Sequence, residues 1–379
     1  MPVPCAGSRW RRCSRPRPEA DVPSRLRPLA PIGPAAALAH GRWVKLICGA
    51  GNQDLAAIED LCAIYALAGV HCIDVAADAA VAAAARRGIA WAAAQRTGGS
   101  AAAPWLMLSL SDGDDPHFRK AGFDPDRCPA DCPRPCQRVC PALAIGEQGG
   151  VLAERCYGCG RCLPACPLGL IEEHQVLLSA EAVPALLQAI RPDTVELHTQ
   201  AGRQAGFAAR LRQLQASGVP LQRLAVSCGL ERGARARTAG RGPSAPALSA
   251  RELAAELWQR YSLVRAAGYR PLWQLDGRPM SGDVGVGTAR AAVKLAEQIR
   301  PWAPPGPLQL AGGTNASTLG LLRPDGGAAG VAFGGMARTL LQPLLLEAEQ
   351  RGRPLRELPE LRLRALALAR GLVEPWLRR

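Results

Sequence analysis

Eight cysteines in two short runs are the residues of this chain that point most directly to chemistry. The first run reads CPADCPRPCQRVCP and the second reads CYGCGRCLPACP, and each ends in Cys-Pro. The second run has the spacing C-x2-C-x2-C-x3-C-P, in which thiolates bind an iron–sulfur cluster. The sequence therefore predicts iron–sulfur ligands at Cys128, Cys132, Cys136, Cys140, Cys156, Cys159, Cys162 and Cys166.

In two-cluster ferredoxins the fourth cysteine of each run binds the cluster of the other run. The predicted ligand sets are Cys156, Cys159 and Cys162 with Cys140, and Cys128, Cys132 and Cys136 with Cys166. We expect [4Fe-4S] clusters. The first run has three residues in every gap, which departs from the ferredoxin spacing, so the type of its cluster stays open.

Zinc and disulfides are the alternative uses of these cysteines. A structural zinc site needs four ligands, usually as two separated C-x2-C pairs, and the tight triplet followed by Cys-Pro does not suit that geometry. Disulfides need an oxidising compartment, and cysteines three residues apart are poorly placed to bridge each other. Both alternatives are therefore less favoured than iron–sulfur clusters.

The composition favours a soluble, cytoplasmic protein. The chain has 379 residues and 14 cysteines, with no charged start followed by an apolar core and cleavage site. No apolar run reaches the roughly 18 residues that a membrane span needs. Abundant thiols without a secretory signal fit a reducing compartment.

The net charge of +14 raises the question of nucleic-acid binding. Most of the excess arginine lies in residues 1–40, 230–250 and 351–379, and the chain has three lysines against forty-three arginines. Codon bias in a GC-rich genome explains this composition. No aromatic residues are interleaved with the basic runs as base stacking would require. The pattern therefore favours a basic surface for acidic partners over nucleic-acid binding.

Short apolar runs that alternate with helical stretches must position the cysteines. The eight strand candidates are 44–49, 71–77, 105–111, 194–200, 223–229, 271–277, 308–313 and 330–335. The helical stretches lie near 53–68, 78–88, 178–190, 203–216, 250–267, 286–298 and 336–350. Eight such units predict a TIM-like (β/α)8 barrel, with an open doubly wound sheet as the alternative.

The same pattern divides the chain into segments. Residues 1–40 read as a disordered arm rich in Arg and Pro, or as a segment that does not belong to the native protein. A ferredoxin-like insert at 113–175 follows the third strand, between barrel segments at 41–112 and 176–350, and a basic helix covers 351–379. Residues 230–250 read as a mobile basic loop. The insert would then project from the C-terminal rim, where barrel active sites are built.

Strand alternation predicts which side chains face the barrel interior, because residues two apart share a face. This rule turns polar side chains inward at Lys45, Asp74, Ser109, Glu196, His198, Gln200, Ser227, Gln274, Asp276 and Gln309. Buried polar groups are costly unless they are paired or used, so the interior reads as a ligand pocket or as groups that pair with one another. His198 and Asp276 are the candidate catalytic residues.

Glycines after the last two strands predict a phosphate site. Gly312 and Gly313 follow the seventh strand, and Gly334 and Gly335 follow the eighth. Many barrels hold a phosphate on backbone N–H groups of these loops. Flavin mononucleotide would suit such a site beside iron–sulfur clusters, although no independent flavin motif is present, and glycine pairs are common in tight turns.

The cysteine runs, together with VELHTQAGR, LAVSCG, LWQLDGRPMSGDVGVGTA and LAGGTN, resemble the cyanobacterial light-dependent period protein family (LdpA). The resemblance extends from about residue 42 to about residue 349 and leaves the N-terminal arm uncovered. It implies an iron–sulfur protein that reports cellular redox state, as a proxy for light, to the circadian clock. It also implies clock and clock-input proteins as partners and the eight cysteines as cluster ligands.

Two functions follow from these features. The first is a redox sensor, in which two clusters exchange single electrons with an unidentified donor. The resulting change of charge alters the surface that the protein presents to a partner. The alternative is an iron–sulfur oxidoreductase, with or without flavin, in which His198 or Asp276 serves as proton donor or base. The family resemblance leaves open whether the barrel is catalytic.

Overall fold

Eight parallel strands close into a barrel, as the sequence predicts. The computed structural model describes residues 32–96, 102–230, 247–278, 285–323 and 326–379. The strand order around the barrel is β1-β10-β9-β8-β7-β6-β3-β2. The strands are β1 (Trp43–Gly49), β2 (Cys72–Ala76), β3 (Trp105–Ser111), β6 (Thr194–His198), β7 (Arg223–Cys228), β8 (Pro271–Asp276), β9 (Leu308–Ala311) and β10 (Gly330–Phe333). Closure rules out the open sheet.

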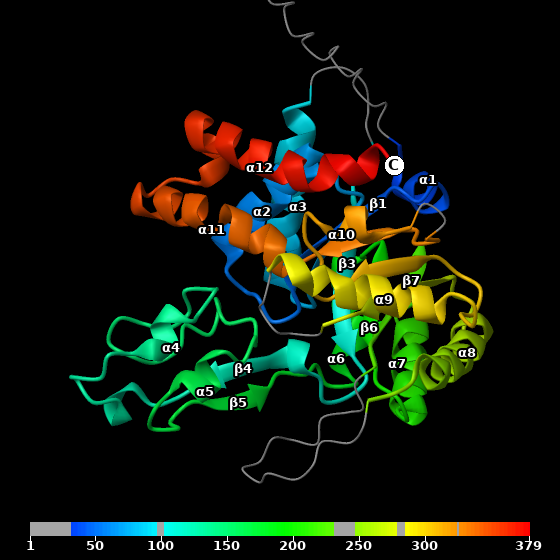
Figure 1. The fold of residues 1–379 in the computed structure, drawn as a ribbon, viewed down its shortest axis with the longest axis horizontal. Coiled ribbons are helices and arrows are strands. Elements are labelled where there is room, and N and C mark those ends of the chain that lie inside the picture. Colours follow the sequence, from blue (N-terminus) through cyan, green and yellow to red (C-terminus); the bar gives the residue numbers. More distant parts are fainter. Residues whose placement is uncertain (1–31, 97–101, 231–246, 279–284, 324–325) are drawn as a thin grey trace, which may run out of the picture. The chain divides into compact units, whose positions relative to one another are not determined.

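Helices surround the barrel (Figure 1). They are α2 (Leu55–Ala68), α3 (Ala79–Ala94), α6 (Ala182–Ile190), α7 (Gln204–Ala216), α8 (Ala250–Ala266), α9 (Ala289–Ile299), α10 (Thr318–Leu321), α11 (Gly335–Gln350) and α12 (Pro359–Leu377). Outward side chains of the strands, such as Val195, Leu197 and Trp273, are fully buried against them. This burial is the main source of stability, at about 25 cal/mol per Å² of apolar surface.

The inserted lobe lies between β3 and α6, on the rim formed by the C-terminal ends of the strands (Figure 1). It contains an antiparallel pair, β4 (Arg119–Gly122) and β5 (Glu172–Gln175), with short helices α4 (Pro135–Arg138) and α5 (Cys162–Ala165). Two single turns of 3-10 helix, η1 (Pro116–Phe118) and η2 (Pro125–Arg127), precede the first cysteine run. We call residues 112–178 the inserted lobe below.

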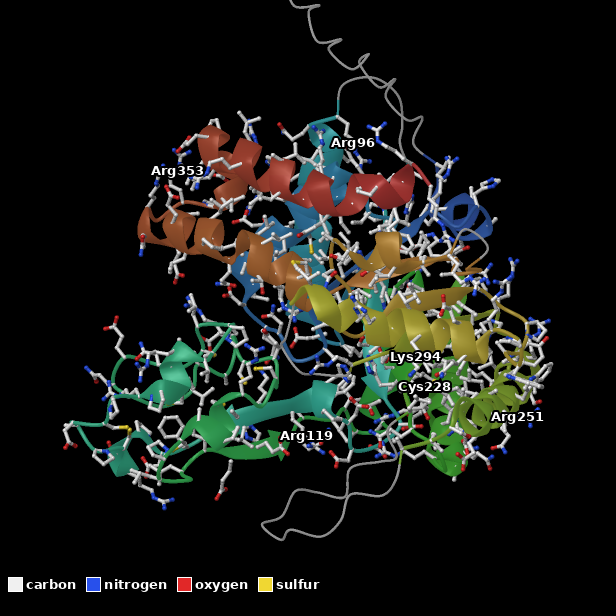
Figure 2. The ribbon with its side chains drawn as sticks, viewed as in Figure 1. Arg96, Arg119, Cys228, Arg251, Lys294 and Arg353 are labelled. Carbon is white, nitrogen blue, oxygen red and sulfur yellow. The ribbon has the colours of Figure 1, made fainter. Side chains whose placement is uncertain are left out.

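Hydrogen bonds attach the inserted lobe to the barrel. Lys120 Nζ donates to Gln53 Oε1 at 2.6 Å, and the backbone N–H of Gln53 donates to Glu154 O at 2.8 Å. Arg119, labelled in Figure 2, is buried and pairs with Asp114 at 2.9 Å and Glu173 at 2.7 Å. Both pairs lie within the lobe, where they fix β4 to β5 and to the segment that follows β3.

The ends of the chain depart in one respect from the prediction. Residues 34–39, assigned to the disordered arm, form helix α1 (Pro34–Ala39), because Ala37 and Leu38 bury their side chains beside Trp43. The rest of the arm lies outside the described residues, as does most of the predicted basic loop at 230–250. Helix α12 occupies the predicted C-terminal position and packs on α2 and α11. None of the described helices is both long and apolar enough to cross a membrane.

Candidate iron–sulfur centre and barrel pocket

The second cysteine run surrounds a small cavity together with the last cysteine of the first run. Cys140, Cys156, Cys159 and Cys162 line this cavity of about 310 Å³ with small and apolar neighbours. Backbone N–H groups donate to two of the sulfurs, from Ala121 to Cys156 and from Ala144 to Cys140, both at 3.3 Å. The fold therefore brings together the four cysteines that the ferredoxin pattern assigns to one cluster.

Glycine is required at one position of this cavity. Gly158 has φ +75°, and a Cβ there would lie 2.1 Å from the carbonyl oxygen of Arg119. Left-handed backbone is unfavourable for residues with a Cβ, and this contact adds a direct clash. Gly160 has φ +73° but open space around it.

Cys136 forms the second group of cysteines with Cys166 and Cys128, whose charges act on it. Burial raises the pKa of Cys136, and the charges of Cys166 and Cys128 add to that effect. Cys166 accepts an N–H from Leu170 at 3.4 Å, and such backbone donors hold its pKa below the usual value although burial opposes them. Cys132 is half-buried in the intervening turn, where its N–H donates to Pro129 O at 3.1 Å.

The donor chemistry of the first cavity fits an iron–sulfur cluster. Burial, followed by the proximity of Cys159 and Cys140, raises the pKa of Cys162 to about 12. Thiolates crowded in this way repel one another unless a cationic centre binds them, and metal coordination deprotonates thiols. The N–H···S contacts are those that tune cluster thiolates in iron–sulfur proteins.

A second and larger cavity opens at the C-terminal mouth of the barrel. It has a volume of about 830 Å³ and is open to solvent. Inward-facing strand residues form its floor: Asp74, Ser109, Glu196, His198, Gln274 and Asp276. Loop residues form its rim: Gly49, His117, Tyr157, Arg278, Gly312, Gly313, Gly334, Gly335 and Arg338. We call this cavity the barrel pocket.

Charged groups in the floor pair with one another. Lys45 is fully buried and bonds Asp74 at 3.4 Å and, more closely, Glu196. Burial alone would lower the pKa of Lys45, but these two carboxylates raise it well above the usual value. Burial likewise opposes ionisation of Glu196, yet Lys45 lowers its pKa to about 2. Lys45 is thus a fixed cation that holds the carboxylates rather than a nucleophile.

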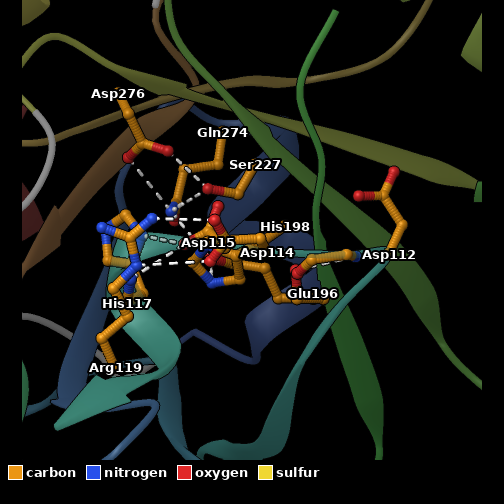
Figure 3. A network of polar contacts seen from close by, with 12 residues as sticks. Asp112, Asp114, Asp115, His117, Arg119, Glu196, His198, Ser227, Gln274 and Asp276 are labelled. Carbon is orange, nitrogen blue, oxygen red and sulfur yellow. Dashed lines mark hydrogen bonds and ion pairs between the residues drawn. The ribbon is translucent and has the colours of Figure 1, made fainter. Parts of the chain in front are cut away.

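The candidate residues His198 and Asp276 both lie in the barrel pocket (Figure 3). His198 Nε2 lies 3.1 Å from Glu196 Oε1, and although burial opposes it, Glu196 raises the pKa of His198 to about 9. Asp276 accepts hydrogen bonds from Ser227 and, at 3.3 Å, from Gln274, while burial raises its pKa. At neutral pH the pocket therefore presents a proton donor and a carboxyl with a raised pKa.

The prediction of which strand side chains face the barrel interior is confirmed at all residues but one. Ser227 lies opposite Gln274 in the strand register, and Gln274 accepts from Gln309 at 2.5 Å. The prediction for Gln200 was wrong, because β6 ends at His198 and Gln200 lies in the following turn, where it does not line the barrel pocket. The four glycines predicted to bind phosphate do line it, and α11 begins at Gly335.

The inserted lobe supplies site residues that strand alternation could not find, among them His117 and Asp115. The ring of His117 contacts that of His198 in a tilted arrangement with centroids 4.7 Å apart, and His117 Nδ1 lies 2.7 Å from Asp115 Oδ1 (Figure 3). Ligand atoms of Asp115, His117 and His198 lie within 4.8 Å of one another. A polar DDPH segment directly after a strand was the only signal in the sequence.

The solved structures that resemble this chain include two enzymes of low sequence identity. One is a type I 3-dehydroquinate dehydratase from Clostridium difficile, 8% identical, covering 82% of this chain and 92% of that one, with a TM-score of 0.35. The other is (S)-3-O-geranylgeranylglyceryl phosphate synthase from Thermoplasma acidophilum, 12% identical, covering 91% and 98%, with a TM-score of 0.30. Similarity this low carries no argument about chemistry.

Sequence comparison is much closer. Light dependent period A of Synechococcus elongatus (strain ATCC 33912 / PCC 7942 / FACHB-805) is 47% identical over 350 residues, which cover 90% of this chain and 93% of that protein. Residues 128–177 match the model of the LdpA Fe-S cluster-binding domain, and residues 186–375 match that of the Light dependent period A C-terminal domain. The resemblance read from the motifs is thus confirmed, and the chain belongs to the light-dependent period A family.

Proposed function

We propose that this chain is an iron–sulfur redox sensor that relays cellular redox state, and through it light, to the circadian clock. Two clusters of the [4Fe-4S] type would exchange single electrons with a cellular donor. The observation that carries the proposal is the cavity in which Cys140 joins Cys156, Cys159 and Cys162. Cys128, Cys132, Cys136 and Cys166 would bind the second cluster.

The position of the clusters supports signalling rather than simple electron carriage. An electron added to a partly buried cluster changes local electrostatic energies by several kcal/mol. The inserted lobe is hydrogen-bonded to the barrel through Lys120 and Gln53, so this charge change reaches the barrel rim. The partners would be clock and clock-input proteins, as the family resemblance implies. Free thiolate ligands need a reducing compartment, which favours the cytoplasm.

Anaerobic purification tests the cluster assignment. We expect about eight iron and eight sulfide per chain if both clusters are [4Fe-4S], together with a low-temperature paramagnetic signal after reduction. Cys156→Ala and Cys162→Ala should each lower the iron content and remove one signal. Cys62→Ala, a buried thiol in α2 away from both runs, is the control and should keep both. Unchanged iron in the first two variants would refute the assignment.

The barrel pocket favours a second candidate, an iron–sulfur oxidoreductase. His198 would donate a proton and Asp276 would accept one, while Gly312, Gly313, Gly334 and Gly335 would hold a phosphate. Flavin mononucleotide carries a phosphate that these glycines could bind and, when bound, would supply hydride and single-electron chemistry. Acid release of the cofactor decides the matter: one flavin per chain favours the oxidoreductase, and clusters alone favour the sensor.

A further inference from the structure

One residue, Tyr157, lines both the cysteine cavity and the barrel pocket. It directly follows Cys156 and is buried. A Cβ added at Gly49 would lie 3.6 Å from Tyr157 Cβ, and a Cβ added at Gly51 would lie 3.8 Å from Tyr157 Cα. The loop after β1 therefore packs tightly on the backbone of Tyr157. A charge in the cysteine cavity can thus act on groups in the barrel pocket across this residue.

Arg338 covers the pocket side of this tyrosine. Its guanidinium carbon lies 4.2 Å from the centroid of the Tyr157 ring, and its Nη1 donates to Ile47 O at 2.8 Å. Its Nε is buried without a hydrogen-bond partner. Within the described parts of the chain, no carboxylate lies within ion-pair distance of Arg338. A partly buried cation with an unused donor is costly, and an anionic ligand would offset that cost.

The surroundings of Arg338 favour an anion at this end of the barrel pocket. Gly334 and Gly335 lie beside it and open the 16-residue helix α11, whose first N–H groups have no side-chain cap. His198, protonated at neutral pH, faces the same pocket. In the floor, Lys45 and His198 pair with the carboxylates of Asp74 and Glu196, and Asp276 adds a third carboxylate. The acidic floor and the basic rim thus confine an anion to the rim.

We infer that the barrel pocket binds a small ligand through a phosphate or carboxylate at Arg338, and that the cluster behind Tyr157 controls its affinity. This inference rests on the proposed cluster at Cys140, Cys156, Cys159 and Cys162. An external one-electron donor reduces that cluster and adds one negative charge beside Tyr157. The charge repels the bound anion and attracts Arg338, so reduction weakens binding.

The coupling acts in both directions. Linkage requires that a ligand whose affinity falls on reduction also lowers the reduction potential of the cluster. The protein would therefore combine two inputs, the redox state of its donor and the concentration of an anionic metabolite. Coupling energies in proteins typically correspond to changes in affinity of about 5- to 150-fold.

The test uses the full chain with its clusters and two probes, inorganic phosphate and malonate. Calorimetric titration of the oxidised and the electrochemically reduced protein should show binding at least about fivefold weaker after reduction. Arg338→Met should lose binding in both states. Lys294→Met removes an exposed positive charge on α9, labelled in Figure 2, and should bind like the wild type.

The outcomes separate this inference from the proposed function. Absence of iron and sulfide would refute the cluster proposal itself. Full clusters with equal anion affinity in both redox states would overturn the linkage. Binding by Arg338→Met as tight as that of the wild type would overturn the assignment of the anion site. If Arg338→Met does not fold, the comparison of oxidised and reduced wild type still decides the linkage, and Arg338→Lys, which keeps the charge, should retain weakened binding.

Discussion

The imidazole of His117, in the inserted lobe, contacts the imidazole of His198, in strand β6, with ring centroids 4.7 Å apart and ring planes tilted by 48°. Asp115 holds His117 and Glu196 holds His198, so each ring is oriented by its own carboxylate. The lobe that carries the cysteines therefore supplies part of the barrel pocket. Cluster domain and barrel form one site rather than two independent modules.

Stability should depend on the protonation of His198. Glu196 raises the pKa of His198 to about 9 in the folded chain, whereas an unfolded histidine titrates near 6.5. A raised folded pKa contributes stability that is full below about pH 6.5 and lost as pH rises through about 9. The free energy of unfolding should fall by up to about 3 kcal/mol across that range. Urea denaturation at several pH values measures it.

His198→Gln provides the comparison for that titration. The variant keeps a polar side chain beside Glu196 but cannot titrate, so its stability should change much less between pH 6.5 and pH 9. An equally steep pH dependence in His198→Gln would assign the effect to another group.

Lys45→Met should destabilise the barrel strongly. The substitution leaves Asp74 and Glu196 buried without their cation, and removing one partner from a buried ion pair costs about 3–5 kcal/mol. Chemical denaturation at pH 7 measures the loss. Adding Glu196→Gln to Lys45→Met should recover part of it, because one uncompensated charge disappears. No recovery in the double variant would contradict this pairing.

Gly158→Ala and Gly160→Ala form a matched pair in the second cysteine run. Both glycines have positive φ, but only a Cβ at Gly158 clashes, 2.1 Å from Arg119 O. Gly158→Ala should lose the adjacent cluster, whereas Gly160→Ala should keep it at a cost of about 1–2 kcal/mol for the left-handed backbone. Iron per chain and melting temperature report both effects. Equal iron content in the two variants would show that the clash is relieved without cost.

Much of the fold could be predicted because apolar periodicity is a local property. Strand alternation correctly turned Lys45, Asp74 and Asp276 inward, since one face of every strand must be apolar to pack on the helices. Gln200 was placed wrongly because alternation does not reveal where a strand ends. Helix α1 was missed because a run of alanines after Pro34 shows no periodicity.

The pocket rim could not be predicted in the same way. Tyr157, His117 and Arg338 come from a loop, the 3-10 turn η1 and helix α11, which are distant in sequence and meet only through tertiary packing. No periodic pattern marks such residues. The cysteines were found because ligand spacing is encoded locally.

The pairing of cysteines between the two runs is the central claim, and paramagnetic resonance of single-cysteine variants tests it most directly. Cys140 shares a cavity with the second run, and the pKa of Cys136 is raised by burial and by the charge of Cys166. We predict that Cys140→Ala removes the same cluster signal as Cys156→Ala, and that Cys166→Ala removes the same signal as Cys136→Ala. Loss of a common signal in Cys140→Ala and Cys136→Ala, with the other signal intact, would contradict the account.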